Sequence, residues 1–104
     1  MVLWIMKWDI NPDKLDSYAE WAQGAIPSVI GGGGVVEFRG YRPVTGDRRV
    51  VVTIEFADMA SWQTWYENET VQDVFDGMAA IALNLETELW GPSPMVPQPI
   101  RPGG

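Results

Sequence analysis

The chain has 104 residues, enough for one domain with a single hydrophobic core and too few for two. Its 14 acidic and seven basic residues give a net charge of −7, which disfavours nucleic acid and anionic membranes as partners. It has no cysteine and no histidine, which excludes disulfides, thiolate nucleophiles, Ser-His triads and imidazole metal sites. No signal peptide is recognisable, so the expected location is the cytoplasm. Six tryptophans and five methionines are the unusual feature.

The first predicted strand covers residues 2–9, V-L-W-I-M-K-W-D, and is apolar on both faces. Such a strand must be covered on both sides, which places it centrally in a sheet or between a helix layer and a second sheet. The tripeptide at 11–13, Asn-Pro-Asp, predicts a helix start capped by its asparagine. One apolar stripe follows at helical spacing, made of Leu15, Tyr18, Ala19, Ala22 and Ile26. Four glycines at 31–34 predict a flexible connection out of this helix.

Residues 35–56 predict a β-hairpin with its turn at 43–47. The first strand alternates, so Val36 and Phe38 share one face and Glu37, Arg39 and Tyr41 share the other. The second strand has an apolar face made of Val50, Val52, Ile54 and Phe56. The hairpin therefore has one face suited to a helix layer and one polar face.

Asp58 predicts the cap of a second helix, which residues 68–70 interrupt before helical spacing resumes up to Met78. Residues 81–90 predict a fourth strand, with a helical extension from residue 71 as the alternative for its first residues. Its apolar side is Ile81, Leu83, Leu85 and Leu89, and its polar side is Asn84, Glu86 and Glu88.

The predicted fold class is α+β, with the ferredoxin-like order βαββαβ and a four-stranded antiparallel sheet. It accounts for residues 1–90. Residues 91–104 form a proline-rich, extended tail, which we interpret as a loose terminus; an arm that lies across a partner subunit is the alternative.

The faces of the first strand determine the predicted site. If Leu3 and Ile5 face the helices, then Trp4, Met6 and Trp8 lie on the open face of the sheet. Large apolar side chains in a row usually mark an interface or a ligand groove, so a second subunit or a ligand should cover them.

Three stretches carry a resemblance to a known superfamily: V-V-E-F-R-G-Y-R at 35–42, E-F-A-D-M-A-S-W at 55–62 and N-E-T-V-Q at 68–72. The chain resembles the dimeric α+β barrel superfamily and, within it, is similar to the antibiotic biosynthesis monooxygenase group. The resemblance implies a homodimer in which two sheets pack face to face and, in some members, cofactor-free oxygenation of phenols or quinols. Other members degrade haem with a histidine, an asparagine and a tryptophan, and the absence of histidine excludes that chemistry here.

The first functional hypothesis is a cavity for a small aromatic or apolar molecule, in a cofactor-independent monooxygenase. Arg39 is the expected anion clamp, because guanidinium binds phenolate through two donors, and a carboxylate raised in pKa by burial is the expected base. The candidate catalytic residues are Arg39, Glu37 and Glu55, and the candidate substrate-binding residues are Trp4, Met6, Trp8, Tyr41, Asn84 and Glu86. No cofactor and no metal site are expected.

The second hypothesis is a dimeric domain without enzymatic activity, which binds a small ligand or serves in assembly. In this case Arg39 pairs with a neighbouring glutamate and the aromatic side chains fill a core. A cavity connected to solvent beside Arg39 and a carboxylate distinguishes the two hypotheses.

Overall fold

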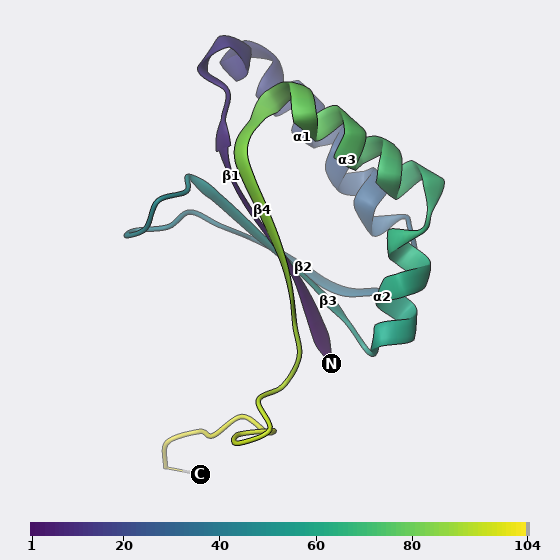
Figure 1. Ribbon diagram of the computed structural model, residues 1–104, viewed down its shortest axis with the longest axis vertical. Coiled ribbons are helices and arrows are strands. Elements are labelled where there is room, and N and C mark those ends of the chain that lie inside the picture. The colour runs from purple at the N-terminus through teal and green to yellow at the C-terminus, as the bar shows by residue number, and fades with distance from the viewer. Residues whose placement is uncertain (104) are drawn as a thin grey trace.

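A computed structural model describes residues 1–103. One curved sheet carries a layer of helices on a single face (Figure 1). The elements in chain order are β1 (Val2–Ile10), a 3₁₀ turn η1 (Pro12–Lys14), α1 (Leu15–Ile30), β2 (Val35–Tyr41), β3 (Val50–Phe56), α2 (Met59–Tyr66), α3 (Glu69–Ile81) and β4 (Ala82–Trp90). The antiparallel sheet has the order β2-β3-β1-β4, so β1 is central, as predicted. The ferredoxin-like fold is therefore confirmed, with α2 and α3 together replacing a single second helix.

Three side-chain caps begin the helical segments, and two of them, at Asn11 and Asp58, are predicted from the sequence. Asn11 Oδ1 accepts a hydrogen bond from the Asp13 amide at 3.0 Å, and Asp58 Oδ1 accepts one from the Ser61 amide at 2.8 Å. The Ser61 amide also lowers the pKa of the Asp58 carboxyl. Asn68 caps α3 in the same way. These caps satisfy amides that have no partner within the helix.

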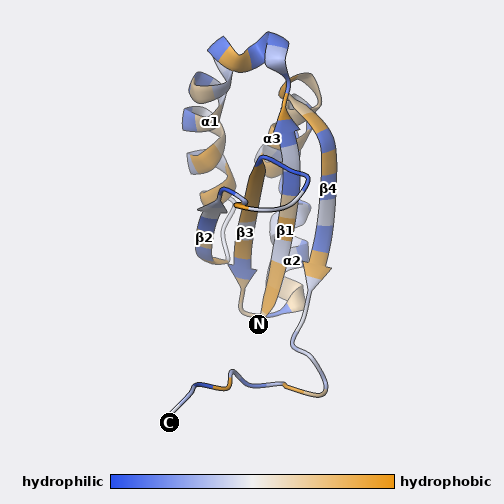
Figure 2. Cartoon of the chain, turned by 90° about the vertical axis from the view of Figure 1, so that its left-hand side faces the viewer, coloured by the Kyte–Doolittle hydropathy of each residue, from blue (hydrophilic) through white to orange (hydrophobic). Residues whose placement is uncertain are grey.

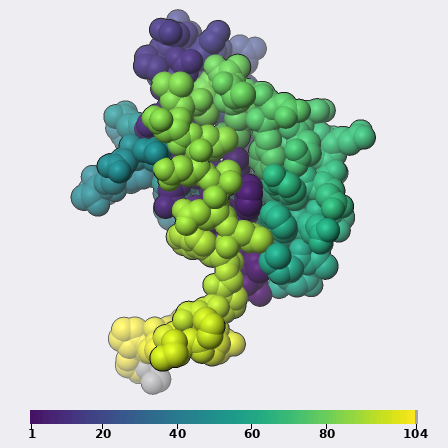
Figure 3. All heavy atoms as spheres, in the orientation of Figure 1, coloured from purple at the N-terminus to yellow at the C-terminus, as the bar shows by residue number. Residues whose placement is uncertain are grey.

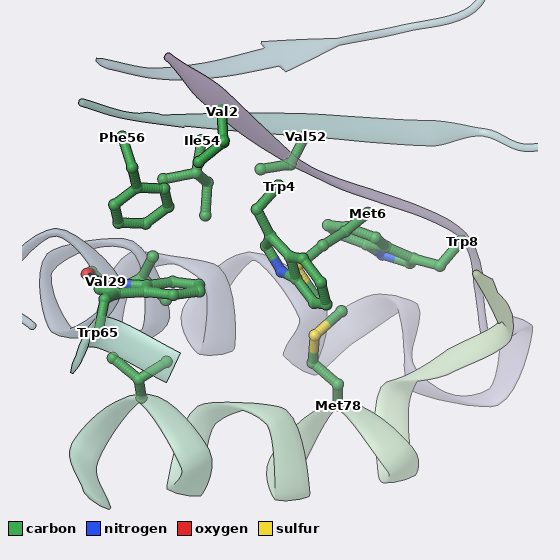
Figure 4. Packing of buried hydrophobic residues seen from close by; sticks show 11 residues of the cluster. Val2, Trp4, Met6, Trp8, Val29, Val52, Ile54, Phe56, Trp65 and Met78 are labelled. Carbon is green, nitrogen blue, oxygen red and sulfur yellow. Dashed lines mark hydrogen bonds between the residues drawn. The ribbon is translucent and has the colours of Figure 1, made fainter. Parts of the chain in front are cut away.

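The faces of β1 differ from the prediction. Trp4, Met6 and Trp8 point from the strand towards the helices and belong to the buried core (Figure 4). They pair in register with Ile54, Val52 and Val50 of β3 respectively. Directly paired residues share a face, so the apolar face of β3 determines which face of β1 the helices cover. Alternation within β1 could not decide this, because both of its faces are apolar.

The opposite face of β1 carries Leu3, Ile5 and Lys7. Within residues 1–103 no helix lies on that face, and Figure 2 views it directly, with the loop between β2 and β3 in front. Ile5 is nevertheless only 1% exposed. Other parts of the chain therefore already cover the centre of the open face.

The stripe on α1 is rotated from the predicted one. Ala25 and Val29 are buried, and Tyr18 and Trp21 pack against the core, whereas Leu15 is 58% exposed. The 3₁₀ turn before α1 places Leu15 at the very start of the helix, away from the sheet. Tyr18, Trp21, Ala25 and Val29 keep helical spacing, and Tyr18, Ala22 and Ile26 of the predicted stripe still line the space between α1 and the sheet, so the predicted face is wrong only in part.

Irregular pairing in the two edge strands moves other predicted core residues to the surface. The register of β2 shifts between Val35 and Glu37, which leaves Val36 exposed and keeps Phe38 opposite Ile54. In β4, Asn84 has a φ of 57° beside a similar shift, and Leu83 pairs with Asp9 of the open face. Leu83 and Leu85, which alternation assigns to the apolar side of this strand and thus to the side suited to the helices, are both exposed, so that assignment is wrong for them.

Residues 91–103 contain no helix or strand and extend away from the body of the domain (Figure 3). Met95 and Ile100 are almost fully exposed there. The last residue of the predicted tail, Gly104, lies outside the described residues.

Candidate functional site

A cavity of about 220 Å³ lies between the sheet and the helices α1 and α3. Aliphatic and aromatic side chains make up almost its entire wall, with contributions from β1, β2 and β3 on one side and α1 and α3 on the other. The lining residues are Met6, Trp8, Tyr18, Trp21, Ala22, Ala25, Ile26, Val29, Phe38, Gly40, Val50, Val52, Ile54, Val74, Phe75 and Met78. The described lining includes no charged side chain, so the cavity suits an uncharged, apolar molecule.

One hydrogen-bonded pair supplies polarity to this wall. The indole Nε1 of Trp8 donates to the phenol oxygen of Tyr18 at 3.2 Å. Burial raises the pKa of Tyr18, and the hydrogen bond from Trp8 opposes that shift only in part. Tyr18 is therefore a neutral phenol at physiological pH, which is a hydrogen-bond donor and not a base.

The edge strand β2 leaves an opening into the cavity. Gly40 and Ile26 are the lining residues that are exposed to solvent. Gly40 pairs with Val52 and therefore faces the helix layer, and a Cβ placed on it would meet nothing within 4 Å. The absence of a side chain at Gly40 thus keeps part of the wall open.

The predicted catalytic residues lie on the other side of the sheet. Arg39 pairs with Thr53, and Glu55 pairs with both Leu3 and Glu37, so all three predicted residues belong to the open face. Arg39 Nε lies 3.4 Å from Glu37 Oε1, and both side chains are more than half exposed. The expectation that Arg39, Glu37 and Glu55 share a face with the β1 aromatic residues is wrong, because the sheet separates them from the cavity.

Other predicted binding residues are also divided by the sheet. Met6 and Trp8 line the cavity. Tyr41 lies on the open face, where the Arg39 guanidinium is 5.9 Å from its ring centroid. Trp4 is buried in the core but does not line the cavity; its ring lies 5.6 Å from that of Trp62. Within residues 1–103 neither of these two indole nitrogens has a hydrogen-bond partner.

Asn84 and Glu86 belong to a polar network on the open face. Asn84 Nδ2 donates to Asp9 Oδ2 at 3.1 Å, and the Asn84 carbonyl accepts from Arg48 Nε at 3.0 Å. Arg48 also forms an ion pair with Glu86 at 2.7 Å. This network ties the loop before β3 to the start of β4, which gives Asn84 and Glu86 a structural role in the isolated chain.

Sequence reasoning missed Tyr18, Trp21 and Gly40 as parts of a site. The predicted stripe includes Tyr18 only as a core residue and does not include Trp21, and Gly40 by itself indicates no site. Alternation along β2 could have indicated this part of the site, because it places Gly40 on the same face as Phe38. A glycine on the core face of an edge strand indicates missing volume.

In the part of the chain that the structure describes, no group of three or more acidic side chains is placed to hold a metal ion. No helix among residues 1–103 has the length and apolar character needed to cross a bilayer.

Comparison with known proteins gives a family and a set of structural neighbours. The family model for antibiotic biosynthesis monooxygenase matches residues 1–77. A protein of the DABB family from Mesorhizobium loti, described as ferredoxin-like, superposes with a TM-score of 0.78 at 14% identity, over 88% of this chain and 96% of that one. A structure described as antibiotic biosynthesis monooxygenase superposes with a TM-score of 0.72 at 14% identity, over 90% of this chain and 100% of that one. A protein from Mycobacterium tuberculosis superposes with a TM-score of 0.71 at 11% identity, over 88% of this chain and 94% of that one. No curated protein matches significantly.

Proposed function

Since the chain belongs to the antibiotic biosynthesis monooxygenase family, we propose that it binds a small, flat, apolar molecule in the cavity between its sheet and its helices. The observation that carries this proposal is the apolar wall with its one polar pair, Trp8 and Tyr18. A pocket of this kind gains affinity from burying apolar surface and orientation from a few polar groups.

We further propose that the bound molecule is a phenol or quinol that reacts with dioxygen without a cofactor. In such a reaction the substrate loses the hydrogen of one ring C–H bond and that of the phenol O–H bond, and both carbons become carbonyls of a quinone. One atom of dioxygen enters the product and the other leaves as water with both hydrogens, so the substrate supplies the electrons. Because the described lining offers no carboxylate or amine, we assign no side chain of the cavity as a base.

The test of the cavity is a binding measurement with a blocked variant. Gly40→Leu places a side chain where a Cβ meets no neighbour, so the fold should tolerate it while the cavity loses volume. We expect Gly40→Leu to weaken binding of naphthalene or 1-naphthol about tenfold or more, as expected when buried apolar contact area is lost. Isothermal titration calorimetry measures this, and oxygen consumption over a panel of phenols and quinols measures turnover.

The matched control is Val36→Leu, which enlarges an exposed side chain on the same strand outside the cavity. It should bind like the unmodified chain. Equal affinities for all three proteins would overturn the cavity as the binding site. Binding that Gly40→Leu abolishes, without turnover of any substrate, would favour the alternative of a non-enzymatic small-ligand-binding domain.

The catalytic roles of Arg39, Glu37 and Glu55 stay predictions. They require a ligand on the open face, where Arg39 and Glu37 already pair with each other. Such a ligand would have to lie between two subunits, because within residues 1–103 no helix covers this face.

We also propose that the chain forms a homodimer through the open face. Family membership supports it, and so do the apolar groups on this face, among them Trp90 at 46% exposed and Tyr41 at 47%.

Trp90→Glu should raise the dimer dissociation constant about tenfold or more, because tryptophans at interfaces often dominate the binding energy. Sedimentation equilibrium measures this constant. Met59→Glu, on the helix layer, should leave it unchanged, and a monomeric unmodified chain at micromolar concentration would contradict the dimer.

A further inference from the structure

We infer that the Tyr18 hydroxyl determines specificity in the cavity by donating a hydrogen bond to the single acceptor oxygen of a neutral, otherwise apolar ligand. The inference rests on the proposed cavity and narrows its ligand class to molecules such as aromatic ketones and uncharged phenols that carry one oxygen. It concerns binding and orientation, and it does not depend on whether oxygenation follows.

The first step is the hydrogen-bonding capacity of Tyr18. A phenol oxygen can accept hydrogen bonds and donate one. Trp8 Nε1 already occupies an acceptor position at 3.2 Å. Within residues 1–103 no acceptor receives the Tyr18 proton. An accepted bond also strengthens the donor on the same oxygen, so Trp8 prepares Tyr18 to donate.

The second step is the lack of an equivalent donor elsewhere in the lining. The Trp8 indole N–H is directed to Tyr18. The Trp21 indole nitrogen lies against Gly77 of α3, where a Cβ would be 3.4 Å from it. The other lining side chains are aliphatic, aromatic without a polar atom, or methionine. The ligand's acceptor oxygen therefore finds one side-chain donor, at Tyr18.

The third step concerns the ligand's charge. A buried anion without a cationic partner is strongly disfavoured, and the described lining contains no lysine or arginine. The raised pKa of Tyr18 keeps its proton in place at neutral pH. A neutral acceptor fits this environment, whereas a phenolate would need the Arg39 guanidinium, which lies across the sheet.

The experiment compares two ligands that differ by one oxygen, 1-tetralone and tetralin, on the unmodified chain and on Tyr18→Phe. The variant keeps the ring and removes the hydroxyl. We expect the ratio of tetralone affinity to tetralin affinity to fall about five- to tenfold in Tyr18→Phe, the usual net effect of one lost hydrogen bond. The dissociation constant of tetralin should change less than about twofold, because its apolar contacts remain. Calorimetric titration measures all four constants.

A second readout needs no variant. The carbonyl stretch of bound 1-tetralone, measured by infrared difference spectroscopy on the unmodified chain, should lie at lower frequency than in cyclohexane. An unchanged affinity ratio in Tyr18→Phe, or a carbonyl frequency equal to that in cyclohexane, overturns the role of Tyr18 and leaves the cavity standing. If neither ligand binds the unmodified chain, the proposed function fails and this inference fails with it.

Discussion

Replacing Trp65 with alanine is expected to lower the free energy of unfolding by about 3–5 kcal/mol, the range for large aromatic side chains removed from a core. Trp65 is fully buried and its ring lies 5.0 Å from that of Phe56 and 5.7 Å from that of Phe75. Its Nε1 also donates to the Val29 carbonyl at 2.8 Å. This one side chain thus joins α2 to β3, α3 and the end of α1. Urea unfolding followed by far-ultraviolet circular dichroism measures the loss.

The total free energy of unfolding of a small domain is about 5–15 kcal/mol, so this variant should be close to unfolding at room temperature. Met59→Ala is the control on the same helix, because Met59 is exposed and its loss should cost about 0.5 kcal/mol or less. Similar unfolding midpoints for the two variants would contradict the assignment of Trp65 to the centre of the core.

Gly32→Ala is expected to lower the free energy of unfolding by about 1–3 kcal/mol, because the added methyl group overpacks the core. A Cβ on Gly32 would lie 2.6 Å from Val71 Cγ2 and 2.8 Å from Trp65 Cδ1. Both neighbours are fully buried, so neither can move away freely. The glycine is therefore required by close packing between the end of α1 and the α2–α3 pair, and the same urea experiment measures its cost.

Gly24→Ala should instead raise the free energy of unfolding. Gly24 lies within α1, and a Cβ there would meet nothing within 4 Å. Alanine should stabilise the helix by about 0.5–1 kcal/mol, the usual difference between the two residues in a helix interior. If both alanine variants were stabilised, packing around Gly32 would have to be looser than described.

The fold was predictable because local signals and strand order agree. The predicted caps at Asn11 and Asp58 and the predicted alternation within β3 are all present in the structure. Errors arose where a segment's own pattern was ambiguous. β1 is apolar on both faces, so only its pairing with β3 could place Trp4, Met6 and Trp8. The bulges in β2 and β4 depend on pairing as well, and no local pattern marked them.

The candidate site was harder to predict for a related reason. The predicted site combines charged residues with aromatic ones, whereas Arg39 and Glu37 alternate with apolar residues along one strand. Although they are neighbours in sequence, alternation places Arg39 and Glu37 on one face of the sheet and Phe38 and Gly40 on the other. The cavity depends instead on a side chain that is missing, at Gly40, and on which face of α1 meets the sheet. Both are properties of packing between elements.

The most direct test of the cavity is the behaviour of the six tryptophan indole N–H signals in a ¹H–¹⁵N spectrum during titration with 1-tetralone. Trp8 and Trp21 line the cavity, whereas Trp90 pairs with Leu3 at the edge of the open face. Binding in the cavity should shift the signals of Trp8 and Trp21 and leave that of Trp90 in place. A shift of Trp90 with Trp8 and Trp21 unmoved would contradict the account and place the ligand on the open face.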